Sequence, residues 1–216
     1  MKIWIAIIVG LGFSLSAEES LPLNLSSGWK ALDFSKGNTN RVEELDGSLK
    51  VIVDQSAGPL IYQFSKARNI SNISFKGRTD GLVQLAGKPQ GLDDTDDFVL
   101  RVGLIYAGTE KLNRLQLALA PGWIKELVHS SPNQTMISKL VLYNVANGKT
   151  EWTKRNHPQS KGLIEEHIVQ NLSQPGQIEL NIETQSANPV IGIWLSCDGD
   201  ETQSKFNVWI DALTIE

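Results

Sequence analysis

The segment FVLRVGLIY, residues 98–106, is apolar at every position except Arg101 and Gly103, and most of its residues are β-branched, aromatic or aliphatic. A strand that is buried on both faces has such a nearly continuous apolar run. Aromatic and β-branched residues pack well on a pleated surface. The segment therefore predicts a central strand in the interior of a β-sheet protein.

The segments on either side of it are short, apolar-rich and separated by turn residues. Residues 41–45 and 48–54 flank Asp46-Gly47, which is the strongest short hairpin signal. The other predicted strands are 28–34, 60–64, 70–78, 140–145, 164–169, 178–182, 190–197 and 206–215. About ten short strands at this spacing predict an all-β, jelly-roll-like or galactose-binding-like two-sheet β-sandwich, with at most one or two short helices.

One segment departs from strand periodicity, and two others predict long loops. Residues 121–129 (PGWIKELVH) begin with proline and space their apolar residues four apart, which predicts a short helix or a cover on one sheet. Residues 87–96 and 148–162 predict long loops, which in compact domains often carry function.

The first residues have the order of a secretory signal peptide. Lys2 precedes an uncharged apolar run over residues 3–13, and small residues follow up to Ala17. The run is shorter than the roughly 20 residues that span a bilayer, although a retained anchor is the alternative. We expect residues 1–17 to be a cleaved signal peptide and residues 18–216 to be a single domain, periplasmic or secreted, with no stable membrane span after cleavage.

The charge balance bears on the class of partner. The formal charge of −4 becomes −5 when the signal peptide with Lys2 is removed. Nucleic-acid partners normally require a basic face, so we expect none. The sequence leaves the oligomeric state open.

Two acidic segments are candidate cation sites. Residues 93–97 (DDTDD) hold four carboxylates, and residues 198–202 (DGDET) form a second oxygen-rich turn. Hard cations such as calcium prefer carboxylate oxygens. The alternative interpretation is that both segments are exposed turns. We take Asp198 and Asp200 as the candidate metal ligands, for a structural calcium, and expect no other cofactor.

Three further residues are candidates for ligand binding. Arg101 lies in an apolar strand and needs a carboxylate partner if it is buried. Asp97 is four residues away, so on an extended strand it shares a face with Arg101. The pair is either structural or part of a site for an anion or a sugar. Trp152 stands among polar residues, where an aromatic face could stack on a sugar ring.

The residues that support catalysis are generic. Cys197 is the single cysteine and lies in an apolar run, as a buried structural residue does. Glu165 and Glu166 are adjacent, so on a strand they point to opposite faces and do not form an acid/base pair. Glu165 and His167 share a face, but no nucleophile motif accompanies them. The sequence leaves enzymatic activity uncertain and favours its absence.

The chain resembles the exported bacterial family known as domain of unknown function family 3047. The resemblance rests on Trp29, on the run from Asp96 to Val102 (DDFVLRV), on residues 191–200 (IGIWLSCDGD) and on Asp211. Trp152 and Arg155-Asn156 only approximate a run of the family. The resemblance implies a jelly-roll-like domain of the cell envelope with unassigned activity. It also raises Asp97, Arg101, Asp198 and Asp200 as one shared polar site.

These observations favour an exported, non-catalytic binding module. Its expected ligand is carbohydrate or another polar component of the cell envelope. Two alternatives stay open. One is a glycan-cleaving enzyme on a jelly-roll scaffold, which needs two facing carboxylates about 5–10 Å apart. The other is an envelope assembly or scaffold component, which would present an exposed apolar patch.

Overall fold

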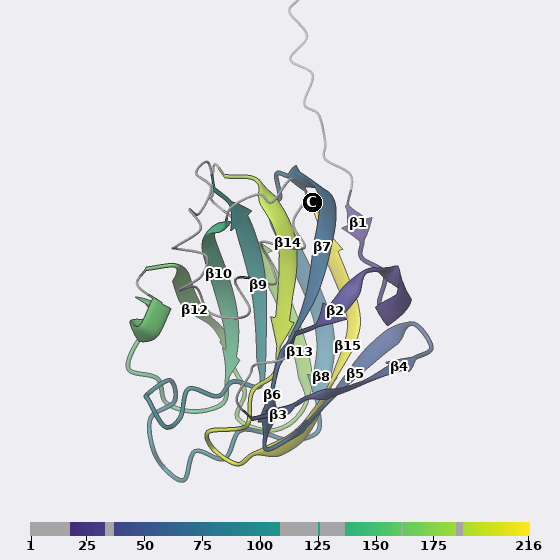
Figure 1. Cartoon of the computed structure of the whole chain (residues 1–216). Helices are drawn as coiled ribbons and strands as arrows, with labels where there is room; N and C mark the ends of the chain where they lie inside the picture. Colours follow the sequence, from purple (N-terminus) through teal and green to yellow (C-terminus); the bar gives the residue numbers. More distant parts are fainter. Residues whose placement is uncertain (1–17, 33–36, 109–124, 126–136, 161, 185–187) are drawn as a thin grey trace, which may run out of the picture.

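The chain folds as two stacked β-sheets (Figure 1). The computed structural model describes residues 18–32, 37–108, 125, 137–160, 162–184 and 188–216. Within these ranges the regular structure is strand, apart from the short 3-10 turns Leu25–Ser27 and Pro158–Ser160 and the helical residue Lys125. The predicted all-β, two-sheet sandwich is therefore confirmed.

The first sheet, sheet A, has the strand order β13-β8-β15-β5-β4, and β1 adds to β15. Its described pairs are antiparallel. Its strands are β1 (Glu19–Ser20), β4 (Arg41–Leu45), β5 (Ser48–Asp54), β8 (Asn72–Thr79), β13 (Gln177–Glu183) and β15 (Lys205–Ile215).

The second sheet, sheet B, has the order β11-β12-β10-β9-β14-β7-β2 and is antiparallel except where β10 pairs with β12. A small parallel pair, β3 (Asn38–Thr39) with β6 (Ser56–Ala57), lies outside both sheets. The strands of sheet B are β2 (Trp29–Ala31), β7 (Pro59–Arg68), β9 (Leu100–Ala107), β10 (Ile137–Ala146), β11 (Lys154–Asn156), β12 (Ile164–Asn171) and β14 (Val190–Ser196).

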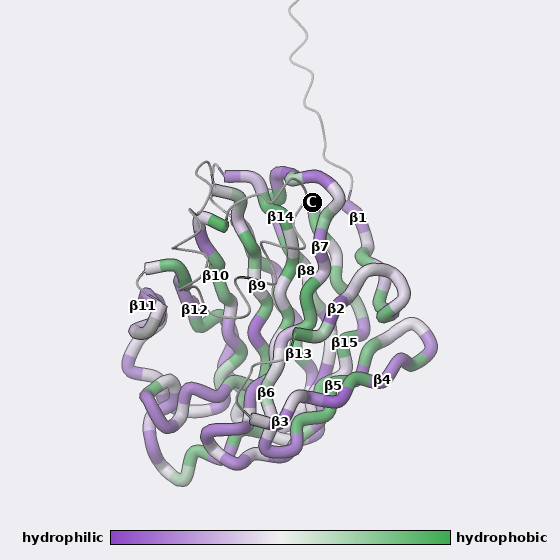
Figure 2. The backbone as a smooth tube through the Cα atoms, in the orientation of Figure 1, coloured by the Kyte–Doolittle hydropathy of each residue, from purple (hydrophilic) through white to green (hydrophobic). Residues whose placement is uncertain are grey.

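The main core lies between the two sheets. Strands of sheet A alternate buried with more exposed residues, and β5 directs Leu49, Val51 and Val53 inward. From sheet B, Leu100, Val102 and neighbours on β14 and β7 join the same cluster. The alternation in sheet A is the pattern of a sheet with one face on the core and one toward solvent. In Figure 2 the strands carry most of the hydrophobic colour and the loops at the lower end are mainly hydrophilic.

Sheet B also buries side chains on its other face, which we call its outer face. A second apolar cluster there includes Ile105 of β9, Leu140 and Leu142 of β10 and Trp194 of β14. Gly103 lies beneath it, and a Cβ at this position would come within 2.7 Å of Leu142 and 2.9 Å of Trp194. Burial on both faces explains why β9 and β14 are buried along almost their whole length.

Each predicted strand overlaps a strand of the described residues, and positions 33 and 34 of the predicted strand 28–34 lie outside them. The hairpin around Asp46-Gly47 is confirmed, because β4 and β5 pair antiparallel and Leu45 lies opposite Ser48. The short strands β1, β3, β6 and β11 were not predicted. The predicted signal peptide at 1–17 lies outside the described residues. So does the predicted helix at 121–129, except for Lys125.

No helix among the described residues has the length and apolar character needed to cross a membrane.

Candidate functional site

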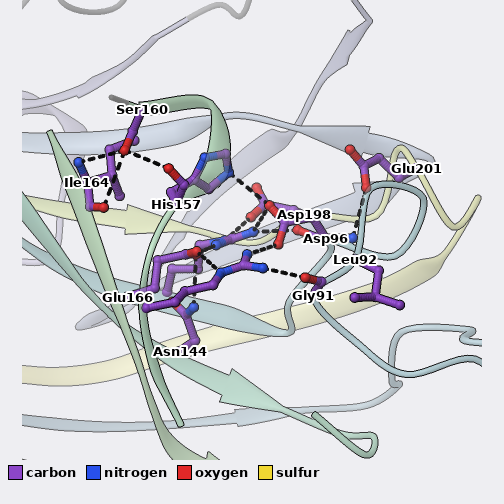
Figure 3. A network of polar contacts seen from close by, with 12 residues as sticks. Gly91, Leu92, Asp96, Asn144, His157, Ser160, Ile164, Glu166, Asp198 and Glu201 are labelled. Carbon is purple, nitrogen blue, oxygen red and sulfur yellow. Dashed lines mark hydrogen bonds and ion pairs between the residues drawn. The ribbon is translucent and has the colours of Figure 1, made fainter. Parts of the chain in front are cut away.

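One end of the outer face of sheet B is polar, in contrast to the apolar cluster beside it. Arg101 projects there from β9, and Figure 3 shows Asp96, Asp198 and Glu166 turned toward one another at this place. Arg101 Nε donates to Asp198 Oδ2 at 2.7 Å, and its Nη1 donates to Glu166 Oε1. Its Nη2 donates to the backbone carbonyl of Asp96. The guanidinium also lies 4.4 Å from the ring centre of Phe98.

A second guanidinium, that of Arg155 on β11, completes the ion-pair network. Arg155 Nε donates to Glu166 Oε2 at 2.6 Å, and its Nη2 donates to Asp96 Oδ1 at 2.6 Å. The other oxygen of Asp96 lies 3.1 Å from Nε2 of His157. Glu166 is fully buried, and the two arginines that contact it compensate for the loss of water around its carboxyl group.

Burial opposes ionisation of both Asp96 and Asp198, but their pKa values are shifted in opposite directions. Burial opposes ionisation of Asp96, but Arg101, His157 and Arg155 together hold its pKa well below the usual range. For Asp198 burial is the largest influence and raises its pKa to about 6, although Arg101 acts against this. The nearby charges of Asp97 and Asp200 contribute to this rise.

Two loops and a turn are fixed beside this network. Gln90 is fully buried, donates to the carbonyl of Asp97 at 2.7 Å and accepts from the backbone of Asn147 at 2.9 Å. Asp97 in turn accepts from the backbone N–H of Thr202 at 2.7 Å and from its hydroxyl at 2.6 Å. Gln90 also accepts from the backbone N–H of Gly148 at 3.0 Å, so the loop 87–96, the start of the loop 148–162 and the turn 198–204 are held together by hydrogen bonds.

A hollow of about 190 Å³, which we call the inner hollow, opens where the polar end meets the apolar cluster. Its apolar side is formed by Leu140, Leu142, Ile164 and Trp194. Its polar side is formed by the ionisable residues Asp96, Asp97, Arg101, His157, Asp198, Asp200 and Glu201. One side of a ligand here would contact hydrocarbon, and the other would contact mostly hydrogen-bond acceptors.

A second hollow of about 440 Å³, which we call the outer hollow, adjoins it. The two share Asp96, His157 and Glu201 as lining residues. Glu201 is exposed as a residue, but its carboxylate accepts from the backbone N–H of Asp96 at 2.8 Å. Partial burial, together with Asp96, Asp97 and Asp200, raises the pKa of Glu201 to about 7.

A third hollow, of about 200 Å³, lies on the outer face of sheet A. Its lining is mainly polar and includes Asn72, Ser74, Asn181 and Thr214. It has no buried arginine and no apolar floor comparable to that of the inner hollow.

The expected pairing of Asp97 with Arg101 is wrong. Both line the inner hollow, but Arg101 forms ion pairs with Asp96, Glu166 and Asp198, whereas Asp97 binds Thr202. The prediction assumed an extended strand from 97 to 101. β9 begins only at Leu100, so the even-spacing rule does not apply across residues 96–99.

Trp152 packs into the loop region and does not contribute to the lining of either hollow. The guanidinium of Arg155 lies 4.0 Å from its ring centre, and the ring of Phe98 lies 6.2 Å away. Gly91 has φ of +85°, and a Cβ there would come within 2.9 Å of the indole. The aromatic residue of the inner hollow is Trp194.

The candidate metal ligands Asp198 and Asp200 both line the inner hollow, but Asp198 is bonded to Arg101. Among the described residues, the set with three ligand atoms mutually within 4.8 Å is Asp96, His157 and Glu166. Arg101 and Arg155 already bind these two carboxylates, so a cation would have to displace guanidinium groups. This chemistry fits an ion-pair network better than a metal centre.

Several residues of the site were not singled out from the sequence. Asp96 belonged to the acidic segment and to one run of the family resemblance, Glu166 was rejected as a catalytic partner, and His157 lay in the predicted loop 148–162. Arg155 was noted only within a partial family run. The two predicted long loops, 87–96 and 148–162, were a signal for this site. They meet in the structure, where a β-bridge joins Gln90 to Thr150.

No family model matches the chain, and no curated protein matches it. The resemblance to domain of unknown function family 3047 therefore stays a prediction.

Solved structures with a partly similar outline include three sugar-binding domains. A family 11 carbohydrate-binding module of a Clostridium thermocellum cellulosomal cellulase has a TM-score of 0.43 at 10% identity, over 93% of this chain and 96% of that chain. A mutant family 29 carbohydrate-binding module has a TM-score of 0.39 at 8% sequence identity, over 93% of this chain and 92% of that chain. The carbohydrate recognition domain of Emp47p has a TM-score of 0.37 at 10% sequence identity, over 87% of each chain. Because these scores are low, the function proposed for this chain is drawn from its own residues.

Proposed function

We propose that this chain is a carbohydrate-binding module that holds a sugar in the inner hollow on the outer face of sheet B. The observation that carries the proposal is the meeting of an apolar floor with a rim of carboxylates in one hollow. Leu142, Ile164 and Trp194 form the floor, and Asp200 and Glu201 belong to the rim.

A sugar fits this arrangement because its ring has both apolar and polar parts. C–H groups pack on aliphatic and aromatic side chains, while hydroxyls donate hydrogen bonds to fixed acceptors. Hydrogen bonds to charged acceptors are the stronger ones. The rim is fixed by the contacts of Asp97 with Thr202 and of Asp96 with Glu201, which lowers the cost of ordering it on binding.

The charge of the hollow selects against acidic ligands. Five carboxylates and one arginine line it, along with His157. The arginine is already bonded to Asp198 and Glu166, so little positive charge is available for an anion. Neutral and basic sugars are the expected ligands, and the predicted signal peptide would deliver the module to the periplasm or the exterior.

The test is a calorimetric titration of the purified domain with cello-, xylo-, manno- and glucosamine oligosaccharides, and with oligogalacturonate as the acidic member. We expect binding to a neutral or basic sugar and none to oligogalacturonate. Asp200→Asn and Glu201→Gln should each weaken binding about tenfold, because each replaces a carboxylate oxygen of the rim with an amide nitrogen, which does not accept a hydrogen bond. Asp54→Asn, on sheet A, is the matched control. Absence of binding to every sugar, or full affinity in both rim variants, would contradict the proposal.

Glycan cleavage is a second candidate, and Glu201 is the observation that favours it. Its pKa of about 7 would leave a proton available on the carboxyl, while the adjacent Asp96 stays ionised. Binding is still favoured, because Arg155 and His157 contact both oxygens of Asp96 and leave it poorly placed to attack. An assay for new reducing ends on the same sugars distinguishes cleavage from binding. Formation of reducing ends by the wild type that is lost in Glu201→Gln would establish cleavage.

A further inference from the structure

The outer hollow has the same kind of lining as the inner one. Leu92 and Pro158 supply apolar surface, and Leu92 is 38% exposed. Asp93 and Asp94 supply acceptors at the rim, and Arg155 supplies a guanidinium. A hollow of about 440 Å³ is more than twice the size of the inner one, so it has room for a further sugar unit.

The two hollows have three lining residues in common. Asp96, His157 and Glu201 line each of them, and Figure 3 labels all three within the network of polar contacts. Asp96 is fixed by Arg155, by His157 and through its N–H to Glu201. A chain molecule crossing from one hollow to the other would therefore pass over a rigid, acceptor-rich ridge.

From this geometry we infer that the outer hollow is a second subsite, and that the ligand is an oligosaccharide of at least two units with no acidic groups. The inference rests on the proposed function and adds the length of the ligand to it. One unit lies against Trp194 and the carboxylate rim. The next lies against Leu92 and Pro158, and the linkage crosses the ridge of Asp96, His157 and Glu201.

Linked subsites predict that affinity rises with chain length. Each unit adds contacts, and the second unit binds without a further loss of rotational and translational freedom. We expect a hexasaccharide to bind at least about tenfold more tightly than the monosaccharide of the same sugar. Oligogalacturonate should not bind at any length, because both hollows carry an excess of carboxylates.

The experiment is a titration with the monosaccharide, disaccharide and hexasaccharide of glucose, xylose, mannose and glucosamine, on the wild-type domain and on Leu92→Ala. The substitution removes apolar contact from the outer hollow, so it should lower hexasaccharide affinity about fivefold and reduce the gain with length. Leu45→Ala is the matched control, since Leu45 is exposed at 42% at the end of β4, away from both hollows.

The outcomes separate the two proposals. Equal affinity for monosaccharide and hexasaccharide, or a hexasaccharide affinity unchanged in Leu92→Ala, overturns the second subsite and leaves sugar binding in the inner hollow standing. No binding by any sugar at any length overturns both. A gain with length that is reduced in Leu92→Ala and retained in Leu45→Ala supports the subsite.

Discussion

The outer faces of the two sheets differ in what they bury. On sheet A, Trp209 is half-buried and lies between Lys50 and Arg78, whose cationic groups are 5.3 and 5.0 Å from its ring centre. On sheet B, Trp194 is 5% exposed and belongs to an apolar cluster. Because buried charges interact more strongly than exposed ones, the buried outer face of sheet B can hold an electrostatic network. The apolar cluster on the same face forms one side of the inner hollow.

The same contrast separates two arginines. Arg78 on sheet A pairs with Asp211 at 2.5 Å, but both side chains are at least one-third exposed. Arg101 on sheet B is buried and contacts three acidic residues. An exposed ion pair contributes little to stability, whereas removing one member of a buried network leaves charges uncompensated. The difference between the faces should therefore be measurable as a difference in unfolding free energy.

The largest expected effect is on Arg101. Arg101→Ala should lower the free energy of unfolding by about 4–5 kcal/mol, because Glu166 and Asp198 would lose their buried partner. Arg78→Ala should lower it by about 1 kcal/mol or less. Urea denaturation of both variants measures this. Losses of similar size in the two variants would contradict the distinction between the faces.

A smaller effect is expected for the two tryptophans. Trp194→Ala should lower the free energy of unfolding by about 3–4 kcal/mol through the cavity that it leaves in the outer cluster. Trp209→Ala should lower it by about 1–2 kcal/mol, since it loses partial burial and two cation–π contacts. Urea denaturation again provides the comparison, and a reversed order would show that the outer cluster of sheet B is not well packed.

The smallest of the three effects concerns pH. Asp198 has a pKa of about 6 in the folded protein and an ordinary value of 3.8, so the folded state binds more protons between these values. The contribution of Asp198 to stability therefore falls as pH rises from about 4 to about 6. Relative to Asp198→Asn, the wild type should lose about 2–3 kcal/mol across this range.

Denaturation at a series of pH values from 4 to 7 tests that expectation. Asp54→Asn is the control, because Asp54 is an exposed carboxylate that pairs with Lys205 on sheet A. A difference between wild type and Asp198→Asn that does not change with pH would mean that Asp198 stays ionised in the network.

The sequence predicted sheet A more completely than the site on sheet B. Alternation in β5, β8 and β13 follows directly from one buried face, and the hairpin at Asp46-Gly47 has its own turn signal. Burial of β9 was also predictable from its apolar run. Each of these is a local property of the chain.

The site was predictable only in part, because its contacts are not local. Arg101 was expected to need a carboxylate, but its partners Glu166 and Asp198 are 65 and 97 residues away in sequence. Strand parity placed Glu165 and Glu166 on opposite faces, as observed. It did not show which of the two faces would be buried. That depends on the parallel pairing of β12 with β10, which the local sequence of β12 does not reveal.

The most direct test of the central claim uses the two tryptophans as reporters of the two faces. Indole N–H signals are assigned by Trp194→Phe and Trp209→Phe, and the domain is titrated with the best-binding oligosaccharide of the panel in a nitrogen–proton correlation spectrum. We predict that the Trp194 signal shifts to saturation while the Trp209 signal does not move. A shift of the Trp209 signal with the Trp194 signal unchanged would place the ligand on sheet A and contradict the account.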